Sequence, residues 1–293
     1  MKPEPRSHFL VFGIVALLAA CSDPDPAPSE FSDREVASTV DAGGLPADVS
    51  ATANALSGQW GLATDWSNCV QFGTSAFELR TYKLALVQVQ QDGNFLRETR
   101  QVCSIVNTPL LGQQTIFPPA LVAAIPPVET VSALGGVSAG ATYLGGLDVQ
   151  VFGVQLADPA FDAMPSGPGD PRLVDVEADG KPGGTLFVGK MCEIYVAIRA
   201  IAQVTGTMVN VGHIEGGGVQ DSTQSTLGGT SAFCTQTYKT TPNHSHNRFV
   251  LHRLVDLGID SDGNGSVDCA ELQAGQAKLI TWRPADNSRC TGK

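Results

Sequence analysis

The chain lacks the short motifs that would identify a nucleotide-binding or zinc-protease site directly. It contains no Walker loop, no G-x-G-x-x-G fingerprint and no H-E-x-x-H helix. It also lacks any C-x-x-C pair, which argues against a cysteine-ligated zinc site. These absences exclude the most recognisable site classes but leave other enzymes open, because catalytic side chains need not be close in sequence.

Positive charge is scarce in this chain. It carries 18 Lys and Arg against 29 Asp and Glu, a net charge of −11, and no segment forms a basic patch. A chain this acidic is repelled by phosphate backbones, so we expect no nucleic-acid partner. Long hydrophobic runs are missing too. The longest, residues 9–20, is shorter than the about 20 residues that a membrane-spanning helix needs.

That hydrophobic run has the layout of an export signal. Lys2 and Arg6 precede it, and small residues follow it. The stretch Leu18-Ala19-Ala20-Cys21 resembles the lipobox of bacterial lipoproteins. The resemblance implies a signal peptide over residues 1–20, cleavage before Cys21 and attachment of a diacylglycerol to the Cys21 thiol. The alternative is an ordinary cleaved signal with a chance cysteine behind it.

The residue after the cysteine bears on location. Ser22, not Asp, follows Cys21. By resemblance to the enteric sorting rules, this favours the outer membrane, with the protein facing the periplasm or the cell surface. Several acyl chains on one cysteine bury enough methylene groups in lipid to give a durable anchor.

The other cysteines predict disulfides. With Cys21 set aside, an even number remains in a chain that looks exported, which indicates three bridges. We favour a sequential pairing because each pair then brackets one supersecondary unit, but the other connectivities remain open. The pairs in this hypothesis are Cys69 with Cys103, Cys192 with Cys234, and Cys269 with Cys290.

Composition divides the exported part into two regions. Residues 22–56 are rich in Ser, Pro, Ala and Asp with a single aromatic, Phe31. Such a stretch cannot bury enough apolar surface to offset its ordering entropy, so residues 21–56 are expected to be a flexible tether. Residues 57–293 form the predicted folded domain, with a possible internal boundary at residues 165–171.

The folded region has the pattern of strands. Residues 81–106 alternate between apolar and polar and break at residues 91–94, which predicts a hairpin. Residues 191–204 also fit a helical stripe, but Val, Ile, Tyr and Thr favour a strand. With 32 glycines and few long helices, the fold class is mainly β, an antiparallel β-barrel or β-sandwich with Gly/Pro-rich loops. Further strands are expected at residues 147–156, 184–211, 232–239 and 248–255, and a short C-terminal helix at residues 269–278.

The start of the folded region carries a second resemblance. Gly58-Gln59-Trp60 resembles the Gly-x-Trp that opens lipocalin-type barrels. The resemblance implies a barrel in which Trp60 plugs one end.

The most informative stretch is DSDGNGSVDCAE, residues 260–271. It resembles the calcium loop of EF-hands, D-x-[DN]-x-[DN]-G-x5-E, at every required position. The alternative is an acidic surface turn, since Leu257-Gly258-Ile259 interrupts the helix that would enter such a loop. The resemblance implies as ligands the side chains of Asp260, Asp262 and Asn264, the carbonyl of Ser266, Asp268 through water, and Glu271 in bidentate mode.

A second acidic stretch repeats only the first half of this pattern. Asp175, Glu177, Asp179 and Gly180 occupy the opening positions, but Leu186 stands where the closing carboxylate belongs. The stretch is either a degenerate calcium loop or a plain polar turn.

Signals for catalysis are weak. Residues 136–140 match G-x-S-x-G and resemble the nucleophile elbow of α/β-hydrolases, which makes Ser138 a weak candidate nucleophile. The elbow needs a strand before it and a helix after it, and no αβ alternation surrounds it here. His244, His246 and His252 share parity and would form a transition-metal site if they lay on one strand, whereas His213 is expected to be structural.

Together these features predict a lipid-anchored, calcium-binding, extracytoplasmic β protein, and they favour a non-catalytic role while leaving enzymatic activity open. It would be a surface or ligand-binding module whose partner, besides the membrane, is a small apolar ligand or an envelope protein. The alternatives are an exported serine-type hydrolase and a structural envelope component.

Overall fold

A computed structural model describes residues 54–190, 192–232, 234–236, 238–280 and 290. The predicted signal peptide, Cys21 and most of the tether lie outside these residues. Among the described residues, no helix is both long and apolar enough to cross a membrane.

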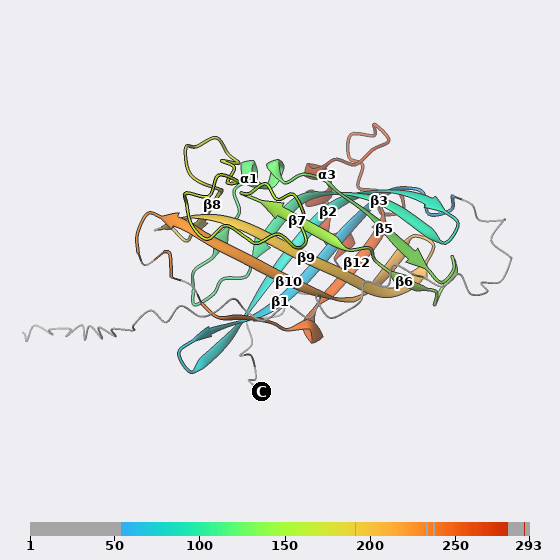
Figure 1. Cartoon of the computed structure of the whole chain (residues 1–293). Coiled ribbons are helices and arrows are strands. Elements are labelled where there is room, and N and C mark those ends of the chain that lie inside the picture. The colour runs from blue at the N-terminus through green and yellow to red at the C-terminus, as the bar shows by residue number, and fades with distance from the viewer. Residues whose placement is uncertain (1–53, 191, 233, 237, 281–289, 291–293) are drawn as a thin grey trace, which may run out of the picture. The chain divides into compact units, whose positions relative to one another are not determined.

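Strands dominate the described part of the chain, and its helices are short (Figure 1). The strands are β1 (Gly58–Phe72), β2 (Ser75–Asp92), β3 (Phe95–Asn107), β4 (Thr115–Ile116), β5 (Val128–Leu134), β6 (Thr142–Leu144), β7 (Asp148–Phe152), β8 (Gly184–Val188), β9 (Cys192–Asn210), β10 (His213–Gly229), β11 (Thr240–Pro242) and β12 (Arg248–Arg253). The helical segments are α1 (Pro119–Ala124), the 3-10 turn η1 (His244–His246), α2 (Leu254–Leu257), α3 (Cys269–Ala274) and α4 (Gln276–Leu279).

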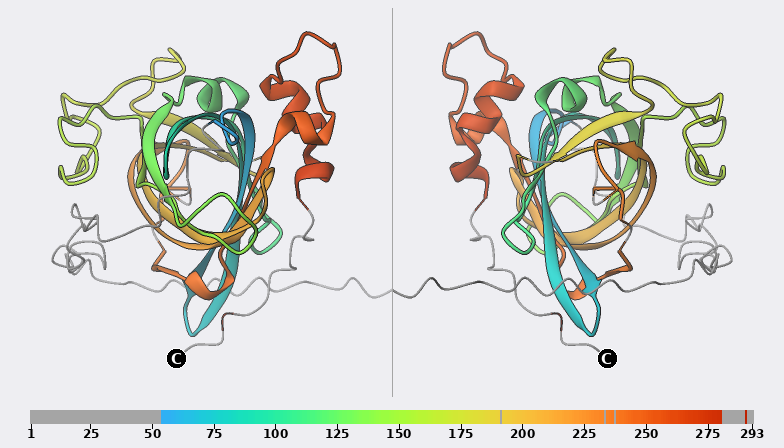
Figure 2. Two further views of the ribbon diagram at one scale, coloured as in Figure 1. Left: turned by 90° about the vertical axis from the view of Figure 1, so that its right-hand side faces the viewer. Right: turned by 90° about the vertical axis from the view of Figure 1, so that its left-hand side faces the viewer.

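The described strands belong to one antiparallel sheet whose pairing closes on itself. The order β10-β12-β1-β2-β3-β4-β8-β9 returns to its start because β9 also pairs with β10. Strands β5 and β6 make a second bridge between β3 and β9. Viewed along this ring, the strands surround the core and the C-terminal helices lie outside it (Figure 2). The predicted mainly β, antiparallel fold is confirmed.

Several predicted elements are confirmed. Strands β2 and β3 form the expected hairpin, whose turn contains Gly93 at φ +61°. The ambiguous stretch at 191–204 falls within strand β9 apart from residue 191, which lies outside the described residues. The C-terminal helix is present as α3 and α4, with Gly275 between them. A strand predicted at 232–239 is wrong, because the described residues there form turns ahead of β11.

The long connection between β7 and β8 contains the possible boundary at 165–171. Both strands pair with β9, β7 at Ile198 to Ala202 and β8 at Cys192 to Val196. The segments on either side of the connection are therefore parts of one sheet.

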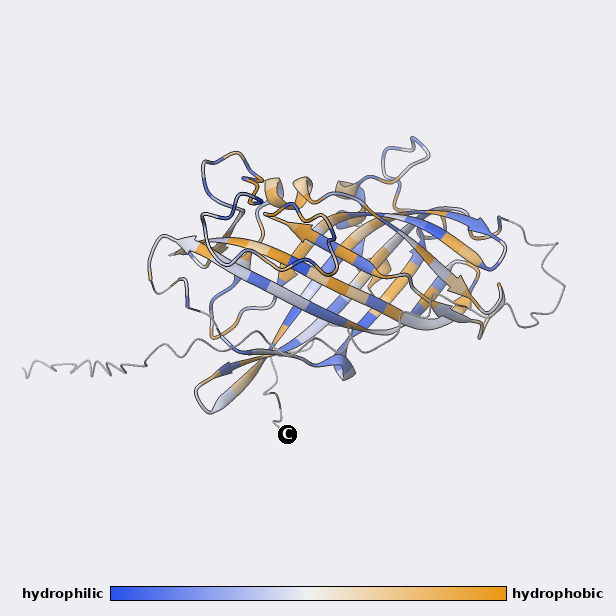
Figure 3. Cartoon of the chain, in the orientation of Figure 1, coloured by the Kyte–Doolittle hydropathy of each residue, from blue (hydrophilic) through white to orange (hydrophobic). Residues whose placement is uncertain are grey.

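The ring interior is filled by large apolar side chains. On β1, Trp60, Leu62 and Trp66 point inward, and alternate residues of the other strands meet them, which gives the strands their hydropathy stripes (Figure 3). The folded region begins slightly before residue 57, the predicted boundary. Leu56 is fully buried, and its carbonyl accepts the Trp60 indole N–H at 2.8 Å.

The interior also holds a buried ion network. The Lys83 ammonium lies 3.1 Å from Asp148, Arg100 pairs with Glu98 at 2.6 Å, and Tyr143 donates its hydroxyl to Glu98 at 2.9 Å. Burial alone would raise the pKa of Asp148, but Lys83 and Arg100 hold it below its usual value. Removing one partner from such a buried pair costs about 3–5 kcal/mol in other proteins, since the remaining charge stays desolvated.

A second apolar layer forms on the outer face of the ring. Leu254, Leu272 and Leu279 of the C-terminal helices pack over β1 with Ala63. They approach so closely because residue 61 is glycine. A Cβ at Gly61 would lie 2.8 Å from the Leu254 Cδ2 atom. This layer fixes the C-terminal segment to the ring.

A β-bulge in β3 supplies the covalent link to this layer. Leu84 of β2 faces Ser104, but its neighbour Ala85 faces Val102, so Cys103 is the extra residue. The bulge turns Cys103 outward, where it forms a disulfide with Cys269 at the start of α3.

Two of the three predicted disulfides are wrong. The structure pairs Cys69 with Cys290 and Cys103 with Cys269, and only the bridge from Cys192 to Cys234 is confirmed. Cys69 and Cys103 cannot pair because β2 lies between their strands. At about 4.8 Å per strand, their Cα atoms are farther apart than the about 7 Å that a disulfide allows.

Candidate functional sites

The loop at 260–271 has the geometry of a cation site. Ligand oxygens of Asp260, Asp262 and Glu271 all lie within 4.8 Å of one another. The backbone N–H groups of Gly263 and Gly265 donate to the two Asp260 oxygens at 2.8 and 2.9 Å, which curls the loop around that carboxylate. Both glycines have positive φ, +73° and +86°, as the tight turn requires.

Glu271 closes the loop. Its Oε1 atom accepts hydrogen bonds from the backbone N–H and the hydroxyl of Ser261 at 2.7 and 2.8 Å. Its Oε2 atom accepts the backbone N–H of Asp268, while Asp268 accepts the N–H of Glu271, a capping box that begins α3. The Ser261 hydroxyl and then the Asp268 and Ser261 amides lower the pKa of Glu271 to about 2, so the carboxylate is ionised at neutral pH.

Asn264 and Ser266 contact each other in this structure. The Asn264 Oδ1 atom accepts from the backbone N–H of Ser266 at 2.8 Å and from its hydroxyl at 2.7 Å. The Asn264 amide in turn donates to Asp262 at 2.8 Å. These two predicted ligands are therefore in the loop and next to the carboxylates, but they bond to each other and to Asp262.

The loop is docked onto the ring by a residue that sequence reasoning missed. The side-chain amide of Gln59 on β1 accepts the Val267 N–H at 2.7 Å and donates to the Val267 carbonyl at 2.6 Å. It makes with the Val267 peptide the pair of hydrogen bonds that a neighbouring strand would make. The Val267 side chain is buried and packs with the apolar residues of the outer layer. No local pattern identifies Gln59, because it lies 208 positions away in the sequence.

The second acidic stretch folds differently. Asp175 accepts the backbone N–H groups of Asp179 and Gly180, which resembles the start of the first loop. Thr185 instead donates its backbone N–H to Glu177 and its hydroxyl to Asp179, each at 2.9 Å. Burial raises the pKa of Glu177, so this carboxyl is less suited to a cation than Glu271.

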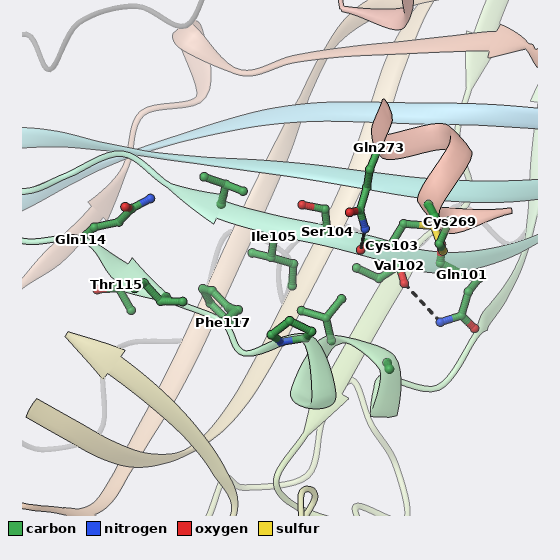
Figure 4. Close-up of a pocket in the computed structure, with 16 residues that line it drawn as sticks. Gln101, Val102, Cys103, Ser104, Ile105, Gln114, Thr115, Phe117, Cys269 and Gln273 are labelled. Carbon is green, nitrogen blue, oxygen red and sulfur yellow. Dashed lines mark hydrogen bonds between the residues drawn. A yellow bond between two sulfur atoms is a disulfide. The ribbon is translucent and has the colours of Figure 1, made fainter. Parts of the chain in front are cut away.

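A groove lies beside the start of α3, next to the 260–271 loop (Figure 4). It has a volume of about 630 Å³ and runs between α1 and α3 along the part of β3 that follows its pairing with β5. Cys269, Ala270 and Gln273 form one wall, and the Gln273 amide donates to the carbonyl of the bulged Cys103 at 2.6 Å. Apolar side chains dominate the rest of the lining, among them Ile105, Val106, Ile116, Phe117 and Val122.

The hydrolase motif does not have the geometry of a nucleophile elbow. Ser138 is exposed in the loop between β5 and β6, so a strand follows it where the motif requires a helix. Asp148, a carboxylate that follows Ser138 in the chain, forms an ion pair with Lys83 inside the ring.

The histidines also differ from the expectation. His244 and His246 lie in η1 and His252 lies in β12, so the three do not share one strand. The Nδ1 atom of His246 lies 2.7 Å from the buried Glu78 carboxylate. His252 instead stacks on His213.

A scan against protein-family models found no match, and searches of the curated proteins and of the solved structures found none similar to this chain.

The Gln59 contact predicts how the loop is held in place. Replacing Gln59 with Leu should weaken calcium binding by roughly tenfold, as expected when about 1.4 kcal/mol of hydrogen bonding that positions the ligands is lost. Isothermal titration of calcium into the purified variant measures this change. The matched control is Gln88→Leu, since Gln88 lies directly across from Gln59 on β2 and is exposed. Equal affinities in both variants would show that the loop does not depend on this docking.

Proposed function

We propose that this chain is a lipid-anchored extracytoplasmic β protein that binds calcium at residues 260–271 and acts as a non-catalytic ligand-binding module. The observation that carries the proposal is the convergence of Asp260, Asp262 and Glu271 in a loop docked on the ring. Anchoring at Cys21, with the outer membrane as location, rests on the lipobox and on Ser22 in the sequence.

The donor set fits calcium. Calcium takes six to eight oxygen ligands at about 2.3–2.6 Å, so two oxygens on one ion lie no more than about 5 Å apart. The oxygens of Asp260, Asp262 and Glu271 meet this limit without rearrangement of the backbone, at 4.8 Å or less. Asn264, the Ser266 carbonyl and Asp268 through water complete the set that the EF-hand resemblance implies.

Calcium would have a structural role. Carboxylates gathered in one loop repel each other, and a divalent cation removes that repulsion. The effect would be transmitted to the ring, because Val267 and Cys269 in and after the loop contact β1 and β3. Sites of this kind in extracellular proteins have dissociation constants of about 10⁻⁴ to 10⁻³ M.

Thermal unfolding tests the calcium site. We expect the melting temperature of the full chain, with its disulfides intact, to be higher in calcium than in a chelator. At a calcium concentration 100 times the dissociation constant, the stabilisation is about 2.7 kcal/mol. In Glu271→Gln the difference between the two conditions should vanish. Glu271 also caps α3, so Glu271→Gln can lower the melting temperature in both conditions. The test is therefore the difference between calcium and chelator within each variant.

The matched control is Glu177→Gln in the second acidic stretch, which should keep the full calcium response. Identical melting temperatures with and without calcium in the unchanged protein would refute the site. A calcium response that survives Glu271→Gln but disappears in Glu177→Gln would place the calcium site in the second acidic stretch.

Metabolic labelling tests the lipid anchor. When the gene is expressed in a bacterium supplied with radiolabelled palmitate, the protein should take up label and fractionate with the outer membrane. Cys21→Ser should remove both properties, since Cys21 is the cysteine at the end of the lipobox-like stretch. Label on Cys21→Ser, or an unlabelled soluble protein, would contradict lipidation at this cysteine.

The groove between α1 and α3 is the proposed ligand site. It offers apolar side chains with a few amides, the composition typical of sites for small apolar ligands. A fluorescent apolar probe should bind the calcium-loaded protein, and Ile116→Glu should abolish binding because it places a charge in the groove. Val131→Glu, at an exposed strand residue outside the groove, is the control and should bind normally. Equal binding by both variants would exclude the groove.

A further inference from the structure

Two histidines meet where the ring of strands closes. Strand β10 pairs with β12 over only four residue pairs, and His213 lies directly opposite His252 at one end of this ladder. Their imidazole centroids are 4.0 Å apart with an angle of 23° between the planes. Residues that face each other across antiparallel strands have Cβ atoms about 4.5–5.5 Å apart, a spacing from which two side chains reach one ion.

Each imidazole has one nitrogen that the rest of the protein leaves unsatisfied. The Nε2 atoms of His213 and His252 are both buried, and neither has a hydrogen-bond partner in the described part of the chain. A buried ring nitrogen without a partner costs free energy, and an ion bound by both atoms would remove that cost.

A carboxylate lies beside His213. Glu215 lies two positions along β10 from His213 and therefore points to the same face of the sheet. Its Oε2 atom is 3.2 Å from His213 Nε2, without forming a hydrogen bond. The Glu215 side chain is 51% exposed and the His213 side chain 17%, so the pair opens to solvent on the Glu215 side. The nearby Asp256 is already paired with Arg253, at 2.9 Å.

We propose that His213, His252 and Glu215 form a transition-metal site, zinc in the first instance, that clips β10 to β12. Two imidazoles and a carboxylate are a donor set that zinc accepts, with water as a fourth ligand. As the side chains lie, the rings are nearly parallel and the three donor atoms are not all within 4.8 Å of one another. Each ring must therefore turn about χ2, and the exposed Glu215 side chain must move toward His252, to direct the donors at one ion. This torsion is broad for histidine. The site differs in chemistry from the calcium loop, because calcium prefers oxygen ligands and does not select imidazole.

The clip would act on a short join of the ring. Strand β10 has sixteen partners on β9 but only four on β12. A metal that binds side chains of both strands is lost when the seam opens, so its binding energy adds to the stability of the closed form. The proposal does not depend on calcium binding or on the lipid anchor.

Competition with a chromophoric chelator tests the site. Zinc is titrated into the full chain with saturating calcium present, so that the carboxylates of the 260–271 loop are occupied. We expect one zinc per chain, and cobalt in its place should give the intense visible absorption of a four-coordinate ion. His213→Gln and His252→Gln should each weaken zinc binding by more than about 100-fold, and Glu215→Gln by at least about tenfold, judged against the 10–100-fold effect of removing even outer-shell partners.

The matched controls are His244→Gln and His246→Gln in η1, which should bind zinc as tightly as the unchanged protein. Glu215→Gln also guards against misfolding, because its side chain is half exposed and its replacement does not disturb the core. The proposal is overturned if the unchanged protein shows no saturable zinc binding. It is equally overturned if the His213 and His252 variants keep their affinity while the η1 variants lose it.

Discussion

Everything in the described structure depends on closure of the strand ring. Strand β9 carries most of this closure, since it pairs with β10 along one edge and with β8, β7 and β6 in turn along the other. The seam between β10 and β12 completes it. Only in the closed form are Trp60 and Trp66 enclosed by strands on all sides, and only then are the charges of Lys83 and Asp148 removed from water together.

Closure also creates the platform for the outer layer. The C-terminal helices have too few residues to be stable alone, and they gain their stability from packing over Gly61 and Ala63 on β1. The disulfide from Cys103 and the amide of Gln59 then fix the acidic loop against that layer. The loop, the start of α3 and one wall of the groove are therefore connected to one another through these contacts. Calcium in the loop would therefore influence the groove without touching it.

The two proposed metal sites differ in the chemistry of their ligands. The loop presents hard oxygen donors on the surface, where a weakly bound and abundant cation can neutralise them. The seam presents buried imidazole nitrogens, where a bound ion would compensate for atoms that the described part of the chain leaves without hydrogen-bond partners. The seam site joins two strands, whereas the ligands of the loop lie within twelve consecutive residues.

Local sequence determined the features that depend on neighbouring residues. The alternation at 81–106 and Gly93 fixed the first hairpin, and the carboxylates and glycines of 260–271 were enough to identify a loop that curls around Asp260. The resemblance of residues 18–21 to a lipobox likewise rests on local sequence. Tertiary structure alone decided which cysteines pair, because a bulge at Cys103 and the order of the strands set those distances. It also decided that Gln59 holds the loop and that His213 faces His252, since these contacts join segments whose separation in the chain carries no periodic signal.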